Sequence, residues 1–357
     1  MKRLRPLARR KQSKAAPRLL FGGILLLAAL GLLWFNEGRA NLADVAARST
    51  AVDDSQPISQ ADGAFVSVTG WLTSDGVLGD DRFIRSGDYV YLQRFVEMYA
   101  WVEKASGTIQ TDNASDSRYQ LEWTAAPTPT DEFEVPRGHE NPPLSLPALT
   151  LTAVNAQVGS VAITPSQITW PHPQQLVLDA SNVVESNYAV SPEYIYMGTG
   201  TLAAPQVGDV RVSFAAVYEN IWVTAFGALG NGRLQPYTYE KDKQLYRVLE
   251  GDRAAALAQL QTEYKNLLWG FRIGGVIVLW LAFMLLFSPL SNLLAAFPPL
   301  QRFGRRLTAV VALLLALALG VSTSMVSAIL HNLWVVLLLL FMGGGLLFFW
   351  QQKNRQS

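Results

Sequence analysis

Three histidines are the residues of this chain best suited to bind a metal or to transfer a proton near neutral pH: His139, His172 and His331. A metal centre needs several converging ligands, whereas these three lie far apart in the sequence. His139 and His172 also lie beside prolines, in segments typical of loops. We therefore interpret the histidines as loop-packing or solvent-exposed residues and predict no metal site.

The remaining catalytic signatures are missing from the sequence. It contains no cysteine, which excludes disulfides, thiolate catalysis and cysteine-based zinc or iron–sulfur sites. It has no G-x-S-x-G, phosphate-loop or H-E-x-x-H motif, and Gly198-Thr199-Gly200 is too short for a dinucleotide fingerprint. We expect no catalytic residue and no cofactor, although the many carboxylates leave a hidden acid–base pair open.

Glu97 and Glu103 are the carboxylates with the most informative surroundings, because both lie in an aromatic run over 89–103 that predicts a strand. On an extended strand, Tyr99 and Trp101 project to the same face as these two glutamates, and Arg94 projects to the other. One interpretation is a polar and aromatic face that supports the fold. The alternative is a recognition surface, and we favour the structural interpretation.

Four apolar stretches dominate the rest of the chain, at 19–35, 267–287, 307–330 and 333–350. Each is near the roughly 20 residues that a helix needs to cross about 30 Å of hydrocarbon. The predicted fold class is an integral membrane α-helical protein with four spans. A large β-rich α+β extracytoplasmic domain, 36–266, is expected between the first two spans, with a basic N-terminus (1–18), a basic loop (288–306) and a tail (351–357).

The charges indicate which way these spans face. All 28 acidic residues lie between Glu37 and Glu263, whereas 1–18, 288–306 and 351–357 carry basic charges without acidic ones. By the positive-inside rule, these three segments and both termini are expected in the cytoplasm. Such segregation indicates membrane topology rather than nucleic-acid binding. A cleaved signal peptide ending near Ala40 is the main alternative to a retained first helix.

Four residues are predicted at the membrane interface on the extracytoplasmic side: Glu37, Arg39, Trp269 and Arg272. Long basic side chains reach the headgroup region there at little cost, so we favour anchoring, with specific lipid recognition as the alternative. No charged residue lies deep in a predicted span, which argues against a proton-coupled pump.

Alternating apolar residues predict several strands in 36–266. The clearest predicted hairpin runs from 208–214 through Tyr218-Glu219-Asn220 into 221–226. A weak similarity between 70–80 and 200–209 leaves open whether the domain is an internal duplication.

Several segments, in order along the chain, resemble the transmembrane protein 43 family, also called LUMA. They are Asn36–Ala40, Leu92–Glu103, Glu122–Trp123, Gly138–Pro142, Val207–Phe214, Trp269–Arg272 and Phe297–Pro298. Within them and the strand described above, the candidate recognition or structural residues are Arg94, Glu97, Tyr99, Trp101, Glu103, Asn141, Pro142, Gly208, Asp209 and Arg211.

The resemblance implies a multi-pass protein of internal membranes, which in eukaryotes is associated with the nuclear envelope, emerin and lamin. This chain departs from the animal pattern in its shorter, more basic N-terminus and its Ala/Leu/Arg-rich composition, which are typical of bacteria. The nuclear partners are therefore not carried over. We expect the cell inner (plasma) membrane, with the endoplasmic reticulum or inner nuclear membrane as the alternative for a eukaryotic chain.

The function expected from these features is a non-enzymatic membrane scaffold that organises a membrane region or protein complex through its extracytoplasmic domain. A channel or transporter component is the first alternative, and a membrane-tethered hydrolase is the second. The expected partners are membrane lipid and either another protein or a second copy of the chain, with no nucleic acid.

Overall fold

The computed structural model describes residues 15–52, 63–104, 119–170, 173–184, 187–288 and 301–331. The predicted basic N-terminus as far as residue 14, His172, residues 289–300 of the predicted loop, and everything after His331 lie outside these ranges. The chain divides into two compact units, residues 1–43 with 260–357, and residues 44–259. We call them the membrane unit and the β unit and describe each by itself.

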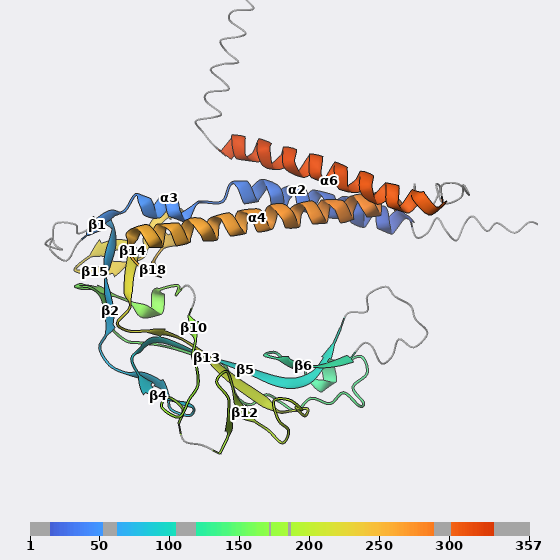
Figure 1. The fold of residues 1–357 in the computed structure, drawn as a ribbon. Helices are drawn as coiled ribbons and strands as arrows, with labels where there is room; N and C mark the ends of the chain where they lie inside the picture. Colours follow the sequence, from blue (N-terminus) through green and yellow to red (C-terminus); the bar gives the residue numbers. More distant parts are fainter. Residues whose placement is uncertain are drawn as a thin grey trace, which may run out of the picture. The chain divides into compact units, whose positions relative to one another are not determined.

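Long apolar helices form the membrane unit (Figure 1). They are α2 (Ala15–Glu37), α4 (Arg253–Leu286), which begins in the β unit, and α6 (Gln301–His331); the short helix α3 (Leu42–Ala47) follows α2. In the described part of the chain, three helices are long and apolar enough to cross a membrane, at Pro17–Ala47, Arg253–Leu286 and Arg306–His331. The predicted spans 19–35 and 307–330 lie inside two of them, and 267–287 lies inside the third except for its last residue.

The predicted four-span fold class is wrong, because the described residues contain three candidate spans. The predicted fourth span, 333–350, lies outside the described residues. That prediction took each apolar stretch of about 20 residues as a span, whereas three helices in the described part of the chain meet the criteria of length and composition. The predicted cytoplasmic C-terminus required a fourth crossing and loses its basis.

Small residues let the membrane helices approach closely. Ala29 and Leu33 of α2 are buried against Leu279 of α4 and Ala316 of α6. A Cβ atom at Gly275 would lie 2.6 Å from Cδ2 of Leu33, closer than two carbons can approach. Glycine at this position therefore leaves room for the Leu33 side chain of α2 against α4, as small residues commonly do between membrane helices.

One sheet of the β unit closes on itself. Its strand order is β1-β2-β8-β9-β15-β14-β18, and β2 also pairs with β14, so that β2, β8, β9, β15 and β14 form a closed ring. The strands are β1 (Thr50–Val52), β2 (Phe65–Ser74), β8 (Ala156–Val158), β9 (Val161–Ile163), β14 (Trp222–Gly230), β15 (Arg233–Gln235) and β18 (Arg247–Glu250). Closing a sheet in this way leaves no free edge within the ring.

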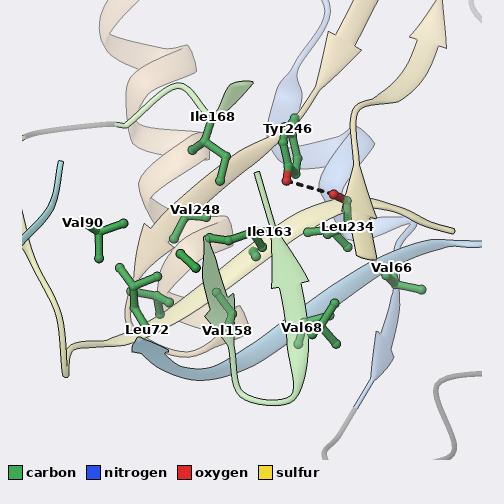
Figure 2. Close-up of a cluster of buried hydrophobic side chains, with 14 of the residues drawn as sticks. Val66, Val68, Leu72, Val90, Val158, Ile163, Ile168, Leu234, Tyr246 and Val248 are labelled. Carbon is green, nitrogen blue, oxygen red and sulfur yellow. Dashed lines mark hydrogen bonds between the residues drawn. The ribbon is translucent and has the colours of Figure 1, made fainter. Parts of the chain in front are cut away.

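Branched aliphatic side chains fill the inside of the ring (Figure 2). Val66, Val68 and Leu72 alternate along β2 and are buried, whereas Trp71 between them is exposed, as expected for a strand with one face on a core. Tyr246 adds a polar tie, because its hydroxyl donates to the Leu234 carbonyl at 2.9 Å and accepts from the Thr164 backbone N–H at 2.8 Å. Burial raises the pKa of Tyr246, so it remains a neutral donor.

The other large sheet is open, with the order β11-β12-β13-β5-β6; β10 also pairs with β13, and β7 with β5. Its strands are β5 (Tyr89–Glu103), β6 (Tyr119–Thr124), β7 (Leu149–Thr152), β10 (Gln174–Gln175), β11 (Ala189–Val190), β12 (Ile195–Met197) and β13 (Val210–Tyr218). β5 and β13 run antiparallel, and the buried residues Leu92, Val96, Val212 and Phe214 build a second core on one face.

Small elements complete the β unit. β3 (Leu78–Asp80) pairs with β4 (Ile84–Gly87), and β16 (Tyr237–Glu240) pairs with β17 (Lys243–Leu245). Two short 3₁₀ helices are η2 (Thr130–Glu132) and η3 (Pro165–Gln167).

The predicted hairpin between 208–214 and 221–226 is wrong in its pairing, although both arms are strands. β13 pairs with β5, β10 and β12, whereas β14 pairs with β2, β15 and β18. The connection binds other segments: Asn220 N–H donates to the Leu72 carbonyl at 2.8 Å, and Glu219 N–H to the Asp88 carbonyl at 2.9 Å. These long-range hydrogen bonds separate the two arms into different sheets.

Candidate functional site

Strand β5 positions the predicted candidate residues by simple alternation. Its even-numbered residues from Leu92 to Ala100, including Arg94, are buried, whereas Glu97, Tyr99 and Trp101 on the other face are partly exposed. We call the accessible side the open-sheet face. It consists of Phe95, Glu97, Tyr99 and Trp101 of β5, Trp123 of β6, Arg211 of β13 and Tyr194.

The centre of the open-sheet face is an ion pair held between aromatic rings. Glu97 and Arg211 are direct partners across β5 and β13, and Arg211 Nε lies 2.7 Å from Glu97 Oε2. The Arg211 guanidinium carbon lies 4.7 Å from the Trp123 ring centroid and 4.5 Å from that of Tyr194. A guanidinium over an aromatic face is attracted by the ring quadrupole, so these contacts fix the cation in place.

Aromatic rings extend this face toward the end of β5. Tyr99 and Trp123 have ring centroids 5.4 Å apart. The Trp101 ring meets the His139 imidazole edge-on at 4.8 Å, and Tyr119 stacks on the same imidazole at 3.8 Å. His139 is thus a loop-packing residue, as predicted. Glu103 accepts a hydrogen bond from the Tyr119 hydroxyl at 3.3 Å, which places Glu103 at the margin of this aromatic group.

Asn141 continues the hydrogen bonding of β5 with its side chain. Its Oδ1 accepts the Trp101 backbone N–H at 2.8 Å, and its Nδ2 donates to the Trp101 carbonyl at 2.9 Å and the Thr128 carbonyl at 2.9 Å. Pro142 lies against Gly208, where a Cβ atom would come within 2.8 Å of the proline Cγ. Gly208 also has φ +93°, a conformation that favours glycine. Asn141, Pro142 and Gly208 are therefore structural residues that hold the backbone around the open-sheet face in place.

Asp209 organises the loop that precedes β13. Its buried carboxylate accepts hydrogen bonds from the Tyr196 hydroxyl and from the backbone N–H groups of Thr199, Gly200 and Gln206. Burial opposes its ionisation, but these donors outweigh burial and lower the pKa of Asp209. Burial, together with the hydrogen bond to Asp209 and its charge, raises the pKa of Tyr196 to about 12. The pair therefore stays a phenol and a carboxylate at neutral pH.

Arg94 lies apart from the other candidate residues, on the core side of β5. Its Nη1 lies 2.6 Å from Asp80 Oδ2, and Nε and Nη2 both donate to the Pro147 carbonyl. Arg94 and Asp80 are 6% and 4% exposed. Arg94 is therefore an internal structural residue and takes no part in a surface shared with Glu97 and Trp101.

A groove adjoins the ion pair on the open-sheet face. It has a volume of about 470 Å³ and is lined by Phe95, Glu97 and Ser213 of this face together with Val96 and Leu146 of the second core. The Phe95 side chain is 43% exposed beside it. A large exposed ring next to a fixed ion pair is the composition that protein interfaces favour. Among the described residues, no group of three or more His, Cys, Asp or Glu side chains could hold a metal ion.

The membrane unit holds the predicted interface residues together. Glu37 at the end of α2 makes a two-point ion pair with Arg272 of α4, with Nε–Oε1 and Nη2–Oε2 distances of 2.8 Å. Trp269 lies 4.9 Å from the Arg272 guanidinium carbon, and Arg39 lies over the Phe271 ring at 4.7 Å. Glu37 is 4% exposed, so its charge depends on Arg272 for compensation.

Neighbouring residues lock α2 to α4 and α6. Asn36 Nδ2 donates to the Leu268 carbonyl at 3.0 Å, and the Ser327 hydroxyl donates to the Trp34 carbonyl at 2.6 Å. A Cβ atom at Gly38 would lie 2.5 Å from Nε2 of His331. The interface segments 36–40 and 269–272 thus contribute to one cluster, which His331 completes.

Comparison with known proteins assigns the chain to a family. The sequence model described as "Transmembrane protein 43" matches residues 98–335. The chain belongs to the transmembrane protein 43 family. It is 24% identical to transmembrane protein 43 of Mus musculus over 80% of this chain and 77% of the mouse protein, and 23% identical to that of Homo sapiens over the same shares. No solved structure matches the chain.

Family membership confirms the predicted resemblance and, with the apolar helices, a membrane protein with transmembrane helices. The transmembrane protein 43 family is not a known enzyme family.

The sequence did not identify Asp80, Trp123, Tyr194 and Tyr196 as contacts of the candidate residues. Of these, Trp123 carried a signal, because it lies in one of the segments that resemble the family.

Proposed function

We propose that this transmembrane protein 43 family member is a non-enzymatic membrane scaffold that binds a protein partner, or a second copy of itself, through the open-sheet face of its β unit. The observation that carries the proposal is the exposed Phe95 ring beside the Glu97–Arg211 pair and the groove of about 470 Å³. Preordered side chains lose little entropy on binding, so this face is suited to recognition.

The arrangement of charges supports a scaffold of the inner membrane whose β unit lies on the side facing away from the cytoplasm. The first 18 residues and the segment 301–306 are basic and free of acidic residues, whereas the β unit and its borders hold all 28 carboxylates. Positively charged flanks remain cytoplasmic during insertion. We therefore expect the N-terminus and the basic start of α6 on the cytoplasmic side.

The topology can be tested by cysteine labelling, because the natural sequence contains no cysteine. A Val154→Cys variant presents an 85% exposed position of the β unit, and Arg18→Cys lies at the exposed start of α2. A membrane-impermeant maleimide is expected to label Val154→Cys in intact cells, and Arg18→Cys only after the cells are broken. The reverse labelling would refute the proposed orientation.

Partner binding is tested by photo-crosslinking in whole membranes of the full-length protein. A photoreactive amino acid at Phe95 is expected to yield a defined adduct, whose mass distinguishes a second copy from another protein. Trp222 is the matched control, because it is similarly exposed, at 41% against 43%, but lies on the ring sheet. The adduct is expected to weaken in a Glu97→Gln and Arg211→Gln double variant, which removes the ion pair without leaving either charge alone.

Two results would reject the recognition role. One is capture at Phe95 no stronger than at Trp222. The other is an adduct that the double variant leaves unchanged. Arg94 is kept in every variant, because it is buried with Asp80 and its removal would test folding instead of binding.

A further inference from the structure

The membrane unit contains a groove between α4 and α6 that the proposed scaffold role does not use. Its volume is about 470 Å³, within the roughly 300–1,000 Å³ of small-molecule sites. Val276, Ile277, Leu317 and Val321 form apolar walls, with Ile277 and Val321 49% and 53% exposed. A groove of this kind on membrane helices favours a hydrocarbon ligand over water, because contact between water and apolar walls is unfavourable.

The same groove has polar residues in its lining. Arg272 and Trp269 both line it, and Arg272 is 28% exposed while its partner Glu37 is buried. Glu37 accepts one N–H from Nε and one from Nη2. A guanidinium carries five N–H groups, so Arg272 retains donors for a further acceptor.

The net charge near Arg272 favours an anionic acceptor. Glu37 pairs with Arg272, whereas Arg39 lies over the ring of Phe271, the residue next to Arg272, and adds a second positive charge. The next charged residues along α4, Glu263 and Lys265, contribute one charge of each sign. The cluster therefore keeps one positive charge. Arginine binds phosphate oxygens well through its planar set of donors.

From the apolar walls and this positive charge together, we infer that the α4–α6 groove is a binding site for an anionic phospholipid. One acyl chain lies along Val276, Ile277 and Val321, and the headgroup phosphate accepts hydrogen bonds from Arg272. This site is separate from the open-sheet face, so lipid binding and partner crosslinking can fail independently of each other.

The test is native mass spectrometry of the full-length protein after exposure to equal amounts of phosphatidylglycerol and phosphatidylcholine. Ala328 lines the groove, so Ala328→Trp fills it. Ala318 is exposed on the same helix α6 but lies outside the groove lining, so Ala318→Trp is the matched control. We expect wild type and Ala318→Trp to retain phosphatidylglycerol preferentially, and Ala328→Trp to retain about tenfold less.

A second variant tests the headgroup contact. Glu37→Gln with Arg272→Gln removes the ion pair without burying an unpaired charge, and it is expected to abolish the preference for phosphatidylglycerol over phosphatidylcholine. The inference is overturned if Ala328→Trp binds lipid like the wild type. Equal retention of the two lipids by the wild type, or an unchanged preference in the double variant, would overturn it as well.

Discussion

The contribution of the buried ion pair between Arg94 and Asp80 to the stability of the β unit can be tested quantitatively. The two side chains are 7% and 4% exposed and 2.6 Å apart, so little solvent weakens their interaction. Removing one partner of a buried pair costs about 3–5 kcal/mol, because the other charge is left without compensation. Asp80→Asn is therefore expected to destabilise the β unit by about 3 kcal/mol or more.

The double variant separates the interaction from the loss of each side chain. Arg94→Met with Asp80→Asn leaves no buried charge, so its cost is expected to be about 2 kcal/mol smaller than the sum of the two single variants. The Pro147 carbonyl loses both of its donors from Arg94 in the double variant, which keeps the total cost above zero.

Urea unfolding of the full-length protein in detergent, followed by tryptophan fluorescence, measures these costs. With a slope of about 2 kcal/mol per molar urea, a loss of about 3 kcal/mol shifts the midpoint by about 1.5 M. If the single effects add to the double effect within about 0.5 kcal/mol, the two residues are not coupled and the reasoning is refuted.

Three further predictions follow from single contacts. Gly38→Ala should lower the melting temperature in detergent, because the new methyl group meets the His331 ring, and His331→Ala should restore it; no rescue would contradict that contact. The lowered pKa of Asp209 contributes stability above about pH 4, which is lost as the pH falls through the folded-state value, so Asp209→Asn should be less stable at pH 7 and less sensitive to acid; an unchanged acid profile would argue against it. Tyr246→Phe leaves the Leu234 carbonyl without its donor and should cost about 1–3 kcal/mol in urea unfolding, whereas a neutral effect would mean that the tie is unimportant.

Patterns that depend on neighbouring residues were predictable from the sequence. The alternation in β5 placed Glu97, Tyr99 and Trp101 on one face, because strand side chains alternate whatever the partner strand is. Hydropathy located α2, α6 and the C-terminal end of α4 within a few residues, because the bilayer sets the length of a span. The start of α4 at Arg253 lies well before the predicted span, because its first turns belong to the β unit. The predicted fourth span, 333–350, lies outside the residues that the structure describes.

Contacts between distant residues were not predictable. Alternation placed Arg94 on the opposite face of β5 from Glu97, but nothing in the sequence marks Asp80, on a separate short hairpin, as its buried partner. The hairpin prediction failed for a similar reason. The sequence Glu219-Asn220 is typical of a turn, but it does not show that the backbone N–H groups of these residues donate to the carbonyls of Asp88 and Leu72. The similarity of 70–80 to 200–209 is not repeated structurally, since 70–72 lies in β2, whereas 200–202 lies outside the named strands.

The short connection between β13 and β14 has a consequence for how the β unit responds to a bound molecule. It joins the open sheet directly to the closed ring, and Val90 of β5 is buried among the ring's own core residues. Sheets joined by a short connection and by core contacts such as those of Val90 are expected to open as one cooperative unit. A partner held on one sheet would thus protect amides of the other from exchange, although it touches none of them.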